Sequence, residues 1–363
     1  MFYRIADIII NSAFRMPSFA AFSCDPAKAD VILTEGGILP SPGMEYYAGA
    51  LKINRLSEGW VFQLAAKEGA GLIANEDYTR LCLAGDDSAL TELGIQIEWL
   101  VRAALECLLI RRGYVSLHAA ALSVDRSAYA FTGPSGMGKS TRAGAWVEAF
   151  DAQMISGDRP LIKVDSMELC GVPWDGKERC YHNVRYPLKM ICEVRRSETV
   201  YARAMSFDQR RYLLMQQSFL PMWDTETSTL QMMNIVKLAR SALIVRMFGG
   251  PLPEDAKAMR KILERREWKK EDYDLKAKSG FELKHVVGEY MLMPTGDNIG
   301  RFNGTVVLNE VSAFIWEKLQ NPMSRDDLLT AILDKYNVEE RNAAKDLDAL
   351  LEKLKRFGVI EEG

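Results

Sequence analysis

AFTGPSGMGKST is the sequence of residues 130–141, and Gly133 to Ser140 within it match the pattern G-x-x-x-x-G-K-[ST]. This pattern cradles phosphate groups in nucleoside triphosphate enzymes, and roughly 1 chain in 100 of this length contains it by chance. The flanks lower that risk, because residues 127–131 are an apolar run typical of a buried strand and residues 141–150 carry a helical pattern. We therefore predict a strand, a glycine loop and a helix, rather than an ordinary glycine turn before a helix.

The residue types of the loop suit a phosphate ligand. Glycines tolerate unusual backbone angles and let the chain approach an anion closely, and N–H groups at the start of a helix then point at it. Lys139 would reach the β- and γ-phosphates, and the Ser140 hydroxyl would hold Mg²⁺. We expect ATP or GTP as ligand, bound by Gly133, Pro134, Ser135, Gly136, Met137, Gly138, Lys139, Ser140 and Thr141.

Composition narrows the class of protein. The chain has 363 residues, 48% apolar and 26% charged, which suits two or three globular domains. A net charge of −3 argues against a nucleic-acid partner. No apolar run is long enough to span a membrane, and Asp7 interrupts any signal-peptide core, so we expect no membrane partner and a cytoplasmic location.

The six cysteines contain no C-x-x-C pair, which favours reduced, structural thiols. Cys170, Cys180, His182 and Cys192 can be drawn as a zinc site, but their spacing fits no common zinc pattern.

Four segments follow from the patterns. Residues 1–88 are β-rich, with strand-like runs at 30–34 and 60–64 between Gly and Pro turns. Residues 89–266 form an α/β domain that opens with a helical pattern over 88–112, capped by Gly113. Residues 267–284 are rich in mixed charge and form a predicted linker, and residues 285–363 form a small C-terminal domain.

Asp158 is the candidate for the second acid that a phosphotransfer site requires. It follows a strand-like run at 153–156, about one βα unit past the loop. There it can position a metal ion or accept a proton from an attacking hydroxyl. The alternative is a turn aspartate before Arg159 and Pro160.

The C-terminal segment has strands at 288–294 and 305–308 followed by three amphipathic helices, which is a winged-helix-like α+β arrangement. Ser324 with Asp327 opens the second helix, and Gly358 ends the third. Residues 285–363 hold nine Lys or Arg against fourteen Asp or Glu. A DNA reader should carry a basic face, so this balance favours a peptide-binding domain over a transcription regulator.

Residues 90–265 resemble the HPr serine kinase/phosphorylase family. The resemblance lies in Leu117-His118-Ala119-Ala120, in the loop, and in Ser156-Gly157-Asp158-Arg159; the spacing from His118 to Gly133 matches the family's. It implies that Asp158 is the catalytic base, that His118 lies beside it, and that related chains form rings. The family's Asp-Asp pair is Gly157-Asp158 here, and its segment for docking the HPr phosphocarrier is not evident. His118 can also be a plain buried histidine.

Residues 285–363 resemble PqqD-like peptide-recognition domains, which serve enzymes that modify ribosomally made peptides. The resemblance includes residues 307–316, Asp346 and residues 358–360. It implies that a leader peptide adds as a strand in a groove between residues 305–308 and the helix at 347–357.

Together these patterns predict an ATP-dependent kinase that phosphorylates a Ser or Thr hydroxyl, or a carboxylate, of a precursor peptide. Its predicted catalytic residues are Asp158, His118 and Lys139, and its metal ligands are Ser140 and Asp158. The alternative is a nucleotide-binding scaffold that delivers the peptide to a separate modifying enzyme. Gly157, in place of an acid, keeps that alternative open.

Overall fold

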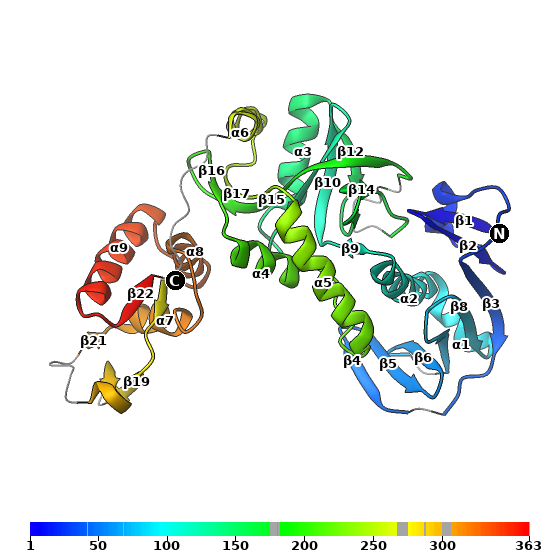
Figure 1. Ribbon diagram of the computed structural model, residues 1–363, viewed down its shortest axis with the longest axis horizontal. Helices are drawn as coiled ribbons and strands as arrows, with labels where there is room; N and C mark the ends of the chain where they lie inside the picture. The colour runs from blue at the N-terminus through cyan, green and yellow to red at the C-terminus, as the bar shows by residue number, and fades with distance from the viewer. Residues whose placement is uncertain are drawn as a thin grey trace. The chain divides into compact units, whose positions relative to one another are not determined.

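The computed structural model describes residues 1–41, 43–67, 69–174, 180, 182–266, 275–286, 288–299 and 306–362. The chain divides into two compact units, Met1–Lys269 and Lys270–Gly363 (Figure 1). The predicted segments 1–88 and 89–266 therefore lie within one unit. Among the described residues, no helix is both long and apolar enough to cross a membrane.

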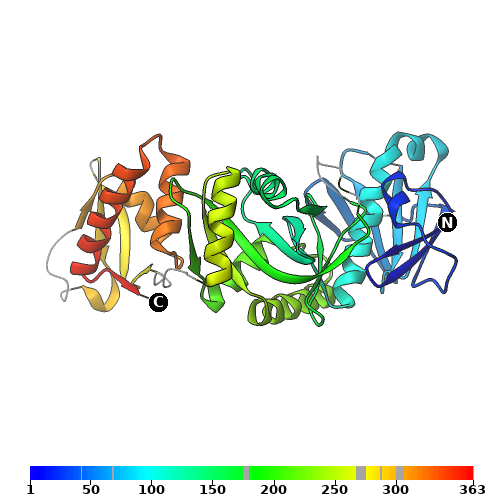
Figure 2. The same ribbon diagram turned by 90° about the horizontal axis from the view of Figure 1, so that it is seen from above.

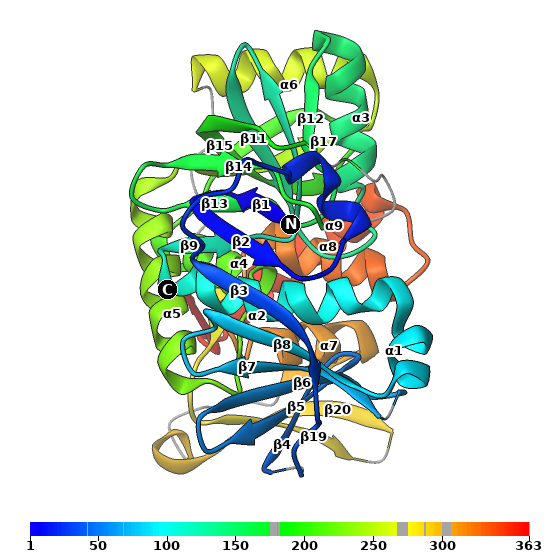
Figure 3. The ribbon, with the colours of Figure 1, turned by 90° about the vertical axis from the view of Figure 1, so that its right-hand side faces the viewer.

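The β-rich start of the chain is one eight-stranded sheet in the order β1-β2-β3-β8-β7-β6-β5-β4 (Figure 3). Its inner face buries Tyr3, Ile10, Phe62 and Leu72 in a core shared with α2. The strands are β1 Phe2–Ile5, β2 Ile8–Ser12, β3 Val31–Gly37, β4 Glu45–Ala48, β5 Leu51–Leu56, β6 Gly59–Leu64, β7 Ala70–Asn75 and β8 Arg80–Gly85.

The helical pattern at 88–112 forms two helices rather than one. α1 covers Asp87–Leu93, a 3-10 turn covers Gly94–Gln96, and α2 covers Ile97–Arg111. Gly94 has a φ of 48°, a left-handed value at which the helix cannot continue. Gly113, with a φ of 77°, follows the end of α2 as predicted. Nearly all of α2 is buried, because it contacts β6 and β7 of the first sheet and β9 of the second.

The second sheet carries the glycine loop. Its order is β12-β10-β11-β15-β14-β13-β9, and β17 pairs with β15 and β16. β15 lies between β11 and β17 and is parallel to both. The strands are β9 Tyr114–Ser116, β10 Ala119–Val124, β11 Ser127–Thr132, β12 Gln153–Ser156, β13 Leu161–Lys163, β14 Glu168–Cys170, β15 Arg185–Arg196, β16 Tyr201–Ala204 and β17 Ile244–Gly249.

Helices cover both faces of this sheet (Figure 1). α3 Lys139–Phe150 and α6 Pro253–Arg265 bury Trp146 and Met259 on one face. α4 Phe207–Gln217 and α5 Thr225–Ser241 bury Leu214 and Ile235 on the other.

A buried polar cluster joins the first sheet to α5. Asp224 is 5% exposed and accepts hydrogen bonds from the Tyr78 hydroxyl at 2.7 Å and the Thr227 hydroxyl at 2.6 Å. Arg111 of α2 pairs with the same carboxylate at 3.3 Å. Because the partners come from β7–β8, α2 and α5, the cluster fixes the two sheets of the first unit together.

We predict that Asp224→Ala lowers the free energy of unfolding by about 3 kcal/mol, because it leaves the buried Tyr78 and Thr227 hydroxyls without their acceptor and the partly buried Arg111 without this carboxylate. The matched control is Glu226→Ala, which removes a 73% exposed partner of the same arginine and should cost under about 1 kcal/mol. Urea unfolding of both variants measures the difference. Equal losses would contradict the role of the cluster.

In the described part of the C-terminal unit, three helices pack on two small sheets (Figure 2). Leu292, Trp316, Leu347 and Leu354 lie in its core. As predicted, Ser324 caps the second helix by accepting from the Asp327 N–H, and Gly358 has a φ of 67° just past the third. The elements are β19 Phe281–Val286, β20 Glu289–Pro294 and β21 Val306–Leu308, then α7 Glu310–Lys318, α8 Arg325–Lys335 and α9 Glu340–Arg356.

The predicted linker 267–284 is too long at its C-terminal end. Residues 267–274 lie outside the described residues, but β18 Leu275–Ala277 pairs with β22 Ile360–Glu362, and β19 begins at Phe281. The sequence pattern did not reveal these strands for two reasons. The segment is rich in mixed charge, and the partner of β18 is some eighty-five residues away.

Candidate functional site

The glycine loop has the strand–loop–helix arrangement that its sequence predicts. β11 ends at Thr132 and α3 begins at Lys139. Gly133, Gly136 and Gly138 have φ values of 138°, 82° and 85°, which side chains disfavour. Gly138 is the N-cap of α3, so the loop delivers the N–H groups of the first helical turn to its concave side. Ser140 and Thr141 are exposed in that turn.

Lys139 folds back over the loop. Its ammonium donates to the carbonyls of Gly133 at 2.9 Å and Pro134 at 3.2 Å. Burial lowers the pKa of Lys139, and the nearby carboxylate of Asp158 opposes that shift. An oxygen of a bound phosphate can therefore replace these two carbonyls as the hydrogen-bond acceptor of the Lys139 ammonium.

Arg142 fixes the loop to the sheet. Its guanidinium, on the first turn of α3, donates to the carbonyls of Met137 and Arg195, each at 2.9 Å, and of Gly249. Arg196, at the end of β15, donates to the Gly136 carbonyl at 2.7 Å. The loop is thus tied to the carboxyl ends of β15 and β17.

Asp158 and His118 meet beside Lys139. The Asp158 Oδ1 and His118 Nε2 atoms are 3.6 Å apart. The backbone sets this approach, because Ala119 N–H donates to the Asp158 carbonyl at 2.7 Å and His118 N–H donates to the Gln217 carbonyl at 2.7 Å. The structure therefore brings together the three predicted catalytic residues, which lie on β11–α3, on the segment before β10 and just after β12.

Arg102 is a neighbour of this group that sequence patterns did not reveal. Its guanidinium lies 3.8 Å from Asp158 and 3.3 Å from Glu106, a buried carboxylate one helical turn along α2. The only sequence signal is the i, i+4 spacing of an arginine and a glutamate on a helix predicted to be apolar. Arg102 thus places a cation beside the carboxylate that is the predicted proton acceptor or metal ligand.

Glu193 is a second residue that sequence reasoning missed. It lies on β15 in register with Thr132, the last residue before the loop. It is buried and pairs at 2.6 Å with both Arg195 and Arg246. An acid within the apolar run of residues 190–194 is the signal that could have identified it.

Two sets of side chains are candidate metal ligands. Within the described ranges, no three His, Cys, Asp or Glu side chains are grouped to hold a metal ion, so Cys170, Cys180, His182 and Cys192 do not form a zinc site. Mg²⁺ binds through one or two protein oxygens plus substrate phosphates, keeping several waters. The Ser140 hydroxyl and the Asp158 carboxylate suit that mode of binding.

His118 has a lowered pKa. Burial is the main cause, and the charge of Lys139 adds to it, while Asp158 and a hydrogen bond with Gln217 oppose it. The imidazole is therefore neutral at pH 7, where it can accept as well as donate a hydrogen bond.

We predict opposite shifts from two substitutions. Lys139→Met removes a repelling cation and should raise the pKa of His118, whereas Asp158→Asn removes an attracting anion and should lower it further. NMR titration of the imidazole signals measures both, since the chain has three histidines and His118→Gln identifies the signal. Shifts in the same direction, or none, would show that the three side chains are not in electrostatic contact.

The C-terminal unit has a sheet edge of its own, apart from the site at the glycine loop. β21 is the outer strand of the order β19-β20-β21. Lys353 of α9 donates to the Val307 carbonyl at 3.4 Å, so the predicted groove is flanked by β21 and α9. Thr305, part of that predicted groove, lies outside the described residues. In a strand, the N–H and C=O of one residue point to the same side, so the N–H of Val307 also faces away from β20.

Comparison with known proteins identifies this unit. Residues 289–360 match the family of coenzyme PQQ synthesis protein D (PqqD), so the chain carries a C-terminal PqqD-like domain, as predicted. Two solved structures are similar over 24% of this chain: "TbiB1 in Complex with the TbiA(beta) Leader Peptide" (21% identity, 94% of that chain, TM-score 0.21) and "Lasso peptide synthetase B1 complexed with the leader peptide" (23% identity, 98% of that chain, TM-score 0.21). No curated protein matches the chain. The resemblance of residues 90–265 to HPr kinases stays a prediction.

Proposed function

We propose that this chain is an ATP-dependent kinase that phosphorylates a ribosomally made precursor peptide, whose leader binds to the PqqD-like domain. The observation that carries the proposal is the meeting of Lys139, Asp158 and His118 at the glycine loop, in a chain that also holds a PqqD-like domain.

The chemistry assigned to the loop is in-line phosphoryl transfer. A Ser or Thr hydroxyl, or a carboxylate, of the peptide attacks the γ-phosphorus, and the bond to the β–γ bridging oxygen breaks to release ADP. Asp158 accepts the proton of an attacking hydroxyl, and Lys139 stabilises the charge on the transferring group. Neutral His118 donates a hydrogen bond to Asp158 or to the phosphate. Mg²⁺, held through Ser140 and Asp158, would supply further charge neutralisation.

The leader-binding domain and the kinase site act on the same peptide because they belong to one chain. Leader binding by the C-terminal domain keeps the rest of the peptide at a raised effective concentration near the kinase site. The acidic balance of residues 285–363 is compatible with a peptide ligand and opposes DNA binding.

We predict that Lys139→Ala and Asp158→Asn each reduce phosphate transfer from ATP to the precursor peptide at least about 100-fold, since each removes one group acting on the transition state. Labelled ATP with full-length protein and peptide measures this. The matched controls are Lys189→Ala, an exposed lysine on β15, and Asp151→Asn, at a left-handed position that Asn tolerates; both should stay near wild type.

The second candidate function is a nucleotide-binding scaffold, favoured by Gly157 in place of an acid. Tight ATP binding by the wild type with no label on any residue of the peptide would establish the scaffold and exclude the kinase.

For the leader, we predict strand addition at β21. Val307→Pro removes the outward N–H of this strand and should weaken leader binding by up to about tenfold, the value of one backbone hydrogen bond. Val307→Thr keeps that N–H and the branched side chain, and should bind like wild type. Fluorescence anisotropy of a labelled leader on the full chain measures both, and equal binding by the two variants would place the leader elsewhere.

A further inference from the structure

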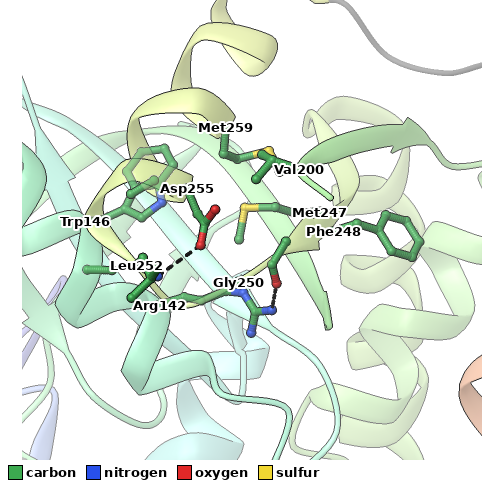
Figure 4. A pocket seen from close by; sticks show the side chains of 12 residues that line it. Arg142, Trp146, Val200, Met247, Phe248, Gly250, Leu252, Asp255 and Met259 are labelled. Carbon is green, nitrogen blue, oxygen red and sulfur yellow. Dashed lines mark hydrogen bonds between the residues drawn. The ribbon is translucent and has the colours of Figure 1, made fainter. Parts of the chain in front are cut away.

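The hollow between α3 and α6 is too small to hold a ligand (Figure 4). Its lining includes Arg142, Met247 and Met259, which are buried, and its free space is that of about one water molecule. This hollow therefore offers no place for a peptide substrate, whereas exposed side chains near Asp158 do.

Trp99 is an exposed tryptophan in a helix that is otherwise nearly all buried. It is 52% exposed, whereas the other five tryptophans within the described ranges are 6% exposed or less. Ile95, in the turn before α2, is a second exposed apolar residue about one helical turn earlier. Large apolar side chains that share an exposed surface are typical of places where a partner binds.

Arg102 connects Trp99 to the proposed kinase site. The two residues are three positions apart on α2, so their side chains are neighbours on one face of the helix. The guanidinium of Arg102 lies 3.8 Å from the carboxylate of Asp158, the predicted proton acceptor. We call Ile95, Trp99 and Arg102 the α2 stripe. It leads from solvent to the carboxylate beside which an accepting hydroxyl would lie.

The α2 stripe is held in place at both ends. Glu98, next to Trp99, is buried, and its carboxylate accepts hydrogen bonds from the Ser18 N–H at 3.2 Å and from the Ser18 hydroxyl. At the other end, Arg102 pairs with the buried Glu106 at 3.3 Å. A surface fixed in this way loses little conformational entropy when a ligand binds to it.

A peptide with its hydroxyl at Asp158 has to continue over the side chains around that carboxylate. An extended chain spans about 3.3–3.6 Å per residue and one helical turn is about 5.4 Å long, so a peptide side chain up to about four residues from the accepting residue can reach Trp99. The face of an indole suits an apolar or aromatic side chain, and the neighbouring Arg102 cation disfavours a basic one.

We propose that the α2 stripe binds the acceptor segment of the precursor peptide, with Trp99 against an apolar side chain within about four residues of the phosphorylated one. This inference rests on the proposed function. It gives the peptide a second contact on the chain, separate from the leader contact at β21.

Steady-state transfer of labelled phosphate from ATP to the full-length precursor peptide tests the stripe. Trp99→Ala should raise the KM for the peptide about tenfold, because the indole contact is lost, and should leave kcat and the KM for ATP within about twofold of wild type. Ile95→Ala should raise the same KM about threefold. The matched control is Tyr47→Ala, which removes an aromatic residue 65% exposed on β4 and should change none of these constants.

Peptide binding gives a second readout, which a merely structural role of Trp99 would not produce. In fluorescence anisotropy with the full-length protein, the labelled precursor should bind about tenfold tighter than its leader alone, because two contacts on one chain act together. Trp99→Ala should remove that difference and leave the affinity for the leader unchanged.

The outcomes separate the two proposals. Wild-type protein that transfers no phosphate to the peptide would overturn the proposed function, and the acceptor surface with it. Transfer by the wild type, with a peptide KM and a precursor affinity that Trp99→Ala leaves unchanged, would overturn the acceptor surface alone. A Trp99→Ala variant with a smaller oligomer by light scattering would assign the stripe to a second copy of the chain, which also overturns it. A thermal midpoint close to wild type shows that each variant is folded, and Ile95→Ala decides the matter if Trp99→Ala is not.

Discussion

The guanidinium of Arg142 holds three carbonyl groups that belong to three different segments: the glycine loop, the end of β15 and the end of β17. It is 5% exposed, so its charge is balanced by these oxygens rather than by water. The loop needs such a tie because its three glycines have positive φ and little intrinsic preference for one shape. Its concave backbone is therefore a property of the sheet edge as much as of the loop.

On the β10 side of β11, backbone hydrogen bonds of Ala119 and His118 bring an imidazole and a carboxylate beside Lys139. Arg102, from α2, reaches the same carboxylate. α2 also packs on the first sheet, so that sheet supports the site through the helix that it buries. The β-rich start of the chain thus positions the site without contributing a predicted catalytic residue.

Among the described residues of the C-terminal unit, the outer edge of β21 has no strand beside it. The described part of β21 is short, and its neighbour Lys353 places a cation on the edge. Short and charged edges resist unspecific pairing. Val307, 43% exposed, still offers a backbone that a peptide strand can extend.

Local sequence was sufficient wherever local backbone chemistry decides the structure. Gly133, Gly136 and Gly138 between an apolar run and a helical run predicted the loop, and Ser324 and Gly358 predicted helix ends, because φ preference and capping act within a few residues. The motifs also predicted the PqqD-like domain. Sequence failed where partners are distant: the pairing of β18 with β22, the approach of Arg102 to Asp158, and the register of Glu193 with Thr132. Those contacts depend on which strands become neighbours, and only the tertiary structure decides that, because the free energy of long-range pairing and burial is not encoded in any short stretch of the chain.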